Sequence, residues 1–265
     1  MNYADFMRLP ATDMAVTVNG SELCLTGLTF GQQIEVTLRA GLPAKGGDTL
    51  PKDITLRSYI RDRDPSLRFP SRAFVLPSGG DQGLSVSTVN VDLMDLTLLR
   101  LSDRNLLRTM SDGLFATPLD SWQAGYFSDG LATEVWRGKA EPAKPSGQET
   151  LNREITSRLA IPAEAGNLAP GIYLLQASID GKDIDDTGVA TQWFVISDFG
   201  ISSYSGTDGL TVAVRSLADT SAKSGVEVAL VSRANEVLAR AITDDQGIAH
   251  FAPAFRWVRV RPRPR

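Results

Sequence analysis

Thr243-Asp-Asp-Gln-Gly-Ile-Ala-His-Phe251 is the stretch that decides the fold, because it predicts a tight turn running into a β-strand. Gly247 can adopt the positive φ that closes such a turn, and the Asp244 carboxylate can accept a hydrogen bond from its own backbone. The same alternation is seen upstream, where larger apolar side chains take turns with small or polar ones. It runs through Leu210-Thr-Val-Ala-Val-Arg215 and through most of Gly225-Val-Glu-Val-Ala-Leu-Val231. This period of two predicts strands with one buried and one solvent-facing side.

The same period recurs towards the N-terminus. Ile34, Val36 and Leu38 alternate with polar residues. Further strands are predicted at Ile54–Tyr59, Arg72–Leu76, Leu84–Thr88, Glu134–Lys139, Ala169–Ala177 and Val189–Ile196. The leucine-rich stretch Val91–Leu101 fits a helix or a strand, with the strand favoured, and Asp103–Asp112 is compatible with a short helix. Strands at roughly 8–12-residue spacing with turns between them are typical of β-sandwiches.

The chain is therefore expected to be all-β, built of tandem immunoglobulin- or fibronectin-III-like sandwich modules. Convincing amphipathic helices are nearly absent, which argues against a βαβ architecture. A seven-stranded sandwich takes about 100 residues. Residues 65–197 are long enough for one with an insertion, whereas residues 1–64 and 198–265 are expected to be partial modules.

Composition excludes some classes of partner. The chain has 265 residues, 42% of them hydrophobic, and a net charge of −4, which gives no electrostatic case for nucleic acid. The last ten residues, 256–265, hold five arginines and no acid, so the rest carries −4 − 5 = −9. The basic tail, residues 255–265, is expected to be disordered or an out-of-frame ending, and not a closing strand. Neither a signal peptide nor an apolar run long enough to cross a bilayer is visible.

Few residues are candidates for chemistry, so catalytic, cofactor and metal sites are all expected to be absent. His250 is the only histidine and is expected on a strand face, and Cys24, the only cysteine, is expected to be buried and structural. Zinc sites need several such ligands. Gly79-Gly-Asp-Gln-Gly83 resembles a phosphate loop but lacks its Lys-Ser/Thr. No disulfide can form within the chain.

Carboxylates and aromatic residues are more numerous. Asp103, Asp112, Asp120 and the run Asp183-Ile-Asp-Asp186 lack the spacing of a metal loop and are expected in solvated loops, although the run is compatible with weak calcium binding. Four aromatic residues fall within fifteen positions and are expected in the core of the middle module, with a binding surface as the alternative. They are Trp122, Tyr126, Phe127 and Trp136.

Several segments together resemble one family, the bacterial α2-macroglobulins. The most specific are Arg61-Asp-Arg-Asp-Pro-Ser-Leu-Arg-Phe-Pro-Ser-Arg-Ala-Phe-Val-Leu-Pro77 and Ala190-Thr-Gln-Trp-Phe-Val-Ile-Ser-Asp-Phe-Gly-Ile201. Further matching segments, in the same order as in the family, are Val36–Ala44, Val89–Asn90, Ser102–Leu106, Pro170–Leu175, Asp208–Leu217, Gly225–Val228 and Thr243–Gly247. The resemblance spans nearly all of residues 3–253 and implies macroglobulin-type sandwiches, with residues 65–197 like the MG2 module and 198–265 like the start of the bacterial MG3 module.

The resemblance also implies a function. Members of this family are periplasmic or envelope proteins that trap proteases, and so inhibit endopeptidases in bacterial defence. A protease cuts a bait segment, and the molecule then changes shape around it. Some members add a thioester from a Cys-Gly-Glu-Gln motif, but Cys24 is followed by Leu25-Thr-Gly27. Neither bait nor thioester is recognised, so the chain is expected to be a scaffold fragment, with proteases as partners of a longer parent and macroglobulin modules as neighbours.

Two other hypotheses remain open. A stand-alone binding or adhesion protein of tandem sandwiches would present an exposed aromatic patch to a saturable ligand. A glycosidase would need two carboxylates about 5–10 Å apart across a cleft. The sequence gives no reason to pair any two, so no enzyme activity is expected.

Overall fold

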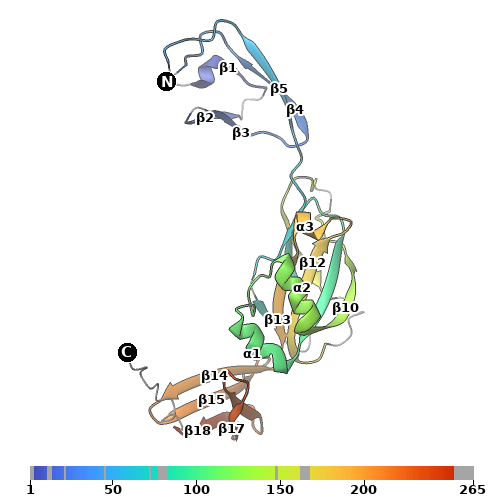
Figure 1. Ribbon diagram of the computed structural model, residues 1–265, viewed down its shortest axis with the longest axis vertical. Helices are drawn as coiled ribbons and strands as arrows, with labels where there is room; N and C mark the ends of the chain where they lie inside the picture. The colour runs from blue at the N-terminus through green and yellow to red at the C-terminus, as the bar shows by residue number, and fades with distance from the viewer. Residues whose placement is uncertain are drawn as a thin grey trace, which may run out of the picture. The chain divides into compact units, whose positions relative to one another are not determined.

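The computed structural model describes residues 3–10, 14–20, 22–44, 46–71, 73–76, 83–146, 149–161 and 168–253. The predicted basic tail and most of the glycine-rich stretch 79–83 lie outside these residues. By its internal contacts the chain divides into two compact units, Met1–Asp64 with Gln148–Arg153, and Pro65–Gly147 with Glu154–Arg265. Figure 1 labels the elements of both units.

The first unit is small and has few buried apolar side chains. A three-stranded antiparallel sheet has the order β1-β4-β5, and β2 and β3 form a separate hairpin. The elements are η1 (Tyr3–Phe6), β1 (Met7–Arg8), β2 (Ala15–Asn19), β3 (Glu22–Thr26), β4 (Gln32–Leu38) and β5 (Ile54–Ile60). Met7 and Val36 are its buried apolar side chains among the described residues.

Residues 65–196 form a sandwich with two sheets. The larger has the order β10-β9-β12-β13-β7, antiparallel except for the parallel pair β13 and β7, and the smaller has the order β11-β8-β6. The strands are β6 (Ser66–Arg68), β7 (Ala73–Leu76), β8 (Gly83–Val89), β9 (Met94–Leu101), β10 (Ala132–Ala140), β11 (Ile155–Ala160), β12 (Gly171–Ile179) and β13 (Ala190–Ile196). The helices are α1 (Asp103–Ser111), α2 (Ser121–Gly130) and α3 (Ile184–Thr187).

The larger sheet is covered on both faces. On one face, Leu96 and Tyr173 pack with Leu84 of the smaller sheet. On the other, Leu99 and Trp193 pack with Phe127 of α2. Figure 1 shows α1 and α2 lying over this sheet.

This double burial explains why the period of Val91–Leu101 is weak. A strand covered on both faces is apolar at successive positions, as in parallel sheets. The prediction of a strand here is confirmed by β9, and that of a short helix by α1. No helix was predicted over α2, because α2 buries only Ala124 and Phe127 and so leaves little amphipathic pattern in the sequence.

Residues 199–251 form a second, thinner pair of sheets with the orders β14-β15-β18 and β16-β17. The strands are β14 (Phe199–Gly206), β15 (Gly209–Ser216), β16 (Glu227–Val231), β17 (Val237–Ile242) and β18 (Ile248–Phe251). The predicted turn is confirmed: Gly247 has φ +71°, and Asp244 Oδ1 accepts hydrogen bonds from the backbone of Gln246 and Ile248 at 2.9 Å.

Candidate functional site

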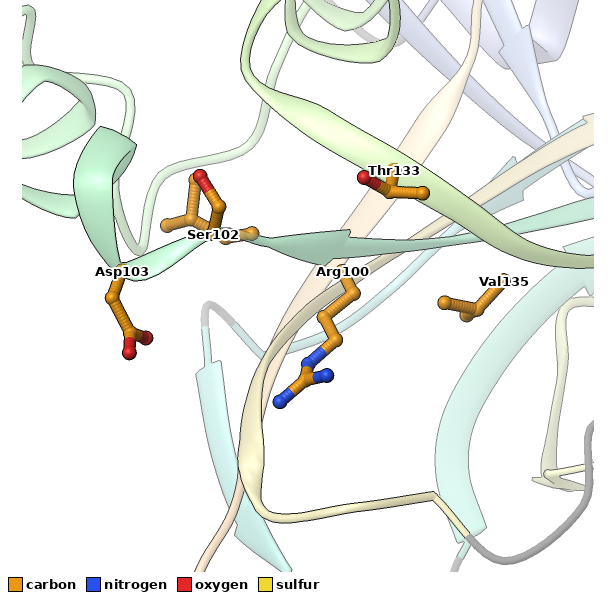
Figure 2. A pocket seen from close by; sticks show the side chains of 6 residues that line it. Arg100, Ser102, Asp103, Thr133 and Val135 are labelled. Carbon is orange, nitrogen blue, oxygen red and sulfur yellow. The ribbon is translucent and has the colours of Figure 1, made fainter.

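One depression on the described surface lies where β9 ends and α1 begins. Its volume is about 370 Å³, and it is lined by Arg100, Leu101, Ser102, Asp103, Thr133 and Val135. A β-bulge helps to shape it, because the β9–β10 register shifts between Glu134 and Trp136 and leaves Val135 as the extra residue. Figure 2 shows the Arg100 side chain extending from β9 and the Asp103 side chain extending from the start of α1.

The chemistry of this depression is limited. The Arg100 guanidinium donates a hydrogen bond to the Pro170 carbonyl oxygen at 3.1 Å, so one of its donor groups is already bound to the backbone. Ser102 precedes α1 but makes no capping hydrogen bond from its side chain. An activated nucleophile needs an adjacent base, and the lining described here has no histidine. The depression therefore offers polar contacts and gives no basis for assigning catalysis.

A second feature is an aromatic platform on the outer side of α1 and α2. The Trp122 and Tyr126 rings stack with centroids 5.9 Å apart and planes 5° from parallel. Arg108 donates to the Tyr126 hydroxyl at 2.5 Å, and its Cζ lies 5.8 Å from that ring centroid. Trp122 is 77% exposed, and a Cβ at Gly125 would meet nothing within 4 Å, so the described residues leave this part of α2 uncovered.

The four clustered aromatic residues thus serve two purposes. Phe127 is fully buried against Trp193, and Trp136 packs against the sandwich core, which agrees with the core interpretation. The same interpretation was wrong for Trp122 and incomplete for the half-buried Tyr126. Trp, Tyr and Arg are the side chains that dominate binding at protein interfaces.

His250 and Cys24 lie on sheet surfaces. His250 is exposed on β18, as predicted, and its Nδ1 is 3.0 Å from Thr211 Oγ1 on the paired strand. Cys24 on β3 is half-buried, which corrects the expectation of a buried thiol, because β2 and β3 form a hairpin that little else covers.

The predicted carboxylates take part in local structure. Asp103 begins α1, Asp112 ends it and pairs with Arg108 at 3.7 Å, and Asp120 caps α2 by accepting from the Gln123 amide at 2.8 Å. The loop expectation was wrong for Asp103, which lies in α1, and for the run Asp183–Asp186, which caps and enters the short helix α3. Within the described ranges, no group of three or more His, Cys, Asp or Glu side chains is placed to hold a metal.

Shifted pKa values arise from exposed ion pairs and turns. The pKa of Lys139 is raised by its hydrogen bond to Asp180, which lowers the pKa of that carboxyl in turn. Hydrogen bonds from Ser221 lower the pKa of Asp219 to about 2. Burial raises the pKa of Tyr173, whose hydroxyl donates to the Ala169 carbonyl at 2.7 Å. Each of these shifts is explained by a hydrogen bond or by burial. None of the four residues lines the depression that contains Arg100.

The described part of the chain contains no helix long and apolar enough to cross a membrane. The sheets define a tandem β-sandwich protein. Its candidate functional sites are on the surface: the depression beside Arg100 and the exposed aromatic side chains.

Comparison with known families identifies these sandwiches. Residues 68–180 match the bacterial alpha-2 macroglobulin MG2 domain, and residues 196–258 match the bacterial alpha-2-macroglobulin MG3 domain. The chain is 28% identical over 233 residues to the alpha-2-macroglobulin of Escherichia coli K12, and 26% identical over 217 residues to that of Xylella fastidiosa 9a5c. These matches cover 86% and 81% of the chain but 13% of each relative.

Solved structures agree. Native E. coli alpha-2-macroglobulin spanning domains MG0-NIE-MG1 matches 95% of this chain and 80% of that one, with a TM-score of 0.55 and 23% identity. A Salmonella alpha-2-macroglobulin mutant matches 95% of this chain and 15% of its own, with a TM-score of 0.65 and 23% identity. The chain belongs to the bacterial α2-macroglobulin family, which confirms the resemblance and the all-β sandwich class.

Proposed function

We propose that the chain is part of the structural frame of a protease-trapping endopeptidase inhibitor in the bacterial periplasm or cell envelope. The observation that carries this is the order of the matches: an MG2 domain followed directly by an MG3 domain, as consecutive modules of one family. Domain boundaries near residues 64 and 197 belong to the same proposal.

The role of a frame is to hold shape while another part of the molecule reacts. A protease trap of this class works by cleavage of a bait and a change of shape, and one solved relative is described as trypsin-activated E. coli alpha-2-macroglobulin, at 25% identity and a TM-score of 0.56. Cys24 lies outside any Cys-Gly-Glu-Gln motif, so it has no part in a thioester. Two of the candidate carboxylates have structural partners, since Asp112 pairs with Arg108 and Asp120 caps α2, and this likewise supports a role as a frame.

The test compares the isolated chain with a chimera. Purified residues 1–265 should give no stoichiometric inhibition of trypsin. The E. coli relative carrying residues 65–253 of this chain in place of its matching segment should retain its response to trypsin, whereas a matched version with a flexible linker there should lose it. Inhibition by the isolated chain, or equal responses of chimera and linker control, would contradict the proposal.

A stand-alone binding or adhesion protein is the second candidate, and the exposed stack of Trp122 on Tyr126 favours it. It predicts saturable binding that quenches the fluorescence of Trp122. Trp122→Ala should abolish the binding, while Trp136→Phe, on the core side, should leave it intact. Absence of any such ligand in envelope extracts favours the frame.

A further inference from the structure

The linker between β5 and β6 has features that favour attack by proteases. Residues 61–65, Arg-Asp-Arg-Asp-Pro, follow the last residue of β5 and form neither helix nor strand. Arg61, Asp62, Arg63 and Asp64 are all exposed. Exposed segments of this kind are preferred sites of proteolytic nicking, and trypsin selects a basic residue before the bond that it cuts. A cut here would break the covalent link between β5 and β6.

A turn from a distant part of the chain supplies hydrogen bonds to this linker. The turn covers Thr150 to Arg153 and is closed by the Arg153 amide, which donates to the Thr150 carbonyl oxygen at 3.2 Å. Asn152, its third residue, has φ +63°. A positive φ at the third position of a turn favours Gly or Asn. The turn therefore accommodates an asparagine, whose amide side chain can both donate and accept hydrogen bonds.

Three groups of Asn152 bind the linker. Its Oδ1 accepts from the Arg63 backbone amide at 2.7 Å, and its Nδ2 donates to Asp62 Oδ1 at 2.8 Å. Its backbone carbonyl oxygen accepts from the Arg63 guanidinium at 3.3 Å. All three residues belong to the first compact unit, so these contacts do not depend on where the second unit lies. The Arg63 N–H, in a segment without regular structure, thus has a hydrogen-bond acceptor.

We infer that Asn152 is a clasp that keeps the linker 61–65 closed to proteases. A folded segment must open locally before a protease can cut it, and when opening is fast the rate of cutting follows the population of the open form. The bonds of Asn152 lower this population, because they exist only in the closed form. In a protease trap, such a clasp directs cleavage away from the frame. That role rests on the proposed function, whereas the closure of the linker does not.

The test measures trypsin cleavage of the full chain after Arg61 and Arg63, where water adds across the peptide bond and leaves a new amine on Asp62 or Asp64. Asn152→Gly removes the side chain, and glycine adopts the positive φ without strain. Cleavage at these two bonds should be at least about tenfold faster than in the wild type, since two hydrogen bonds are lost. The aspartate after each arginine affects both chains alike, so the ratio of rates reports opening. Mass spectrometry of the fragments identifies the bonds.

Asn235→Gly is the matched control, because Asn235 also has φ +63° but lies in the turn between β16 and β17. It should leave cleavage after Arg61 and Arg63 unchanged. Hydrogen exchange gives a second readout, in which the Arg63 amide is protected in the wild type and exchanges at least about tenfold faster in Asn152→Gly. Equal cleavage of the wild type and Asn152→Gly, an equal rise in Asn235→Gly, or an unprotected Arg63 amide in the wild type would overturn the inference, whatever the outcome for protease trapping.

Discussion

The middle sandwich and the sheets that follow it differ in how completely they close their own cores. Around Trp193 and Tyr173, the five-stranded sheet is buried on both faces by β-strands and helices. In the following sheets the buried cluster is Val212, Val214 and Phe251, with other apolar residues only partly covered. The comparison indicates that the middle module encloses a large core of its own, while the sheets of residues 199–251 leave more of their apolar side chains exposed.

The largest expected effect is in the closed core. Trp193→Ala should lower the free energy of unfolding by about 3–5 kcal/mol, because it removes a large buried ring together with its hydrogen bond to the Thr117 carbonyl. Leu238→Ala, an exposed control in the later sheets, should change it by no more than about 0.5 kcal/mol. Urea unfolding followed by near-UV circular dichroism measures both. Similar losses in the two variants would contradict the contrast.

The next effect concerns the turn that decides the fold. Gly247→Ala should destabilise the later sheets by at least about 1–3 kcal/mol, since a Cβ there would lie 2.5 Å from the Val214 carbonyl oxygen at a positive φ. Gly225→Ala is a matched control with φ +74° and nothing within 4 Å of its Cβ. It should therefore lose only the free energy needed to hold an alanine at a positive φ. Thermal melts of the two variants separate the clash from the strain. Equal melting temperatures would show that the close contact with the Val214 carbonyl oxygen adds no destabilisation.

A smaller effect is expected at α2. Asp120→Ala should cost about 1 kcal/mol, because it removes the side chain that accepts from the Gln123 amide and breaks a capping box. Asp120→Asn keeps an acceptor and should recover most of that loss. Denaturant midpoints test the order wild type, Asn, Ala. An Ala variant as stable as the wild type would show that packing of Phe127 alone holds the helix.

The smallest effect is a pH dependence. The pKa of Asp219 is lowered from 3.8 to about 2, so its ionised form stabilises the fold fully above 3.8 and the contribution is lost as the pH falls towards 2. Asp219→Asn should remove this part of the slope, and Ser221→Ala should raise the carboxyl pKa. Chemical-shift titration of Asp219 checks the sign, and titration at its ordinary value would contradict it.

The sequence located many of the strands, but it missed β2, β6 and β14, and it did not reveal the surfaces. Alternation located β4 and β15, and glycine identified the turn at Gly247, because these are local signals. The weak pattern of α2 hid a helix whose one clear signal is the Asp120–Gln123 spacing. Exposure of Trp122 depends on which face of α2 meets the sheet, and no local pattern determines that.

Long-range polar contacts were equally unpredictable. Asn152 Oδ1 accepts from the Arg63 amide at 2.7 Å, and Asn152 Nδ2 donates to Asp62 at 2.8 Å, which joins a later segment to the first unit. These partners are about ninety positions apart in sequence. Only the folded arrangement of the strands brings them together.

The central claim is that the chain acts as a frame within a larger protease trap. An antibody raised against residues 65–197 can measure the mass of the native product in its own cells. The account predicts a product several-fold larger than 28.6 kDa. A product near 28.6 kDa would contradict it and favour a stand-alone binding protein that uses the Trp122 platform.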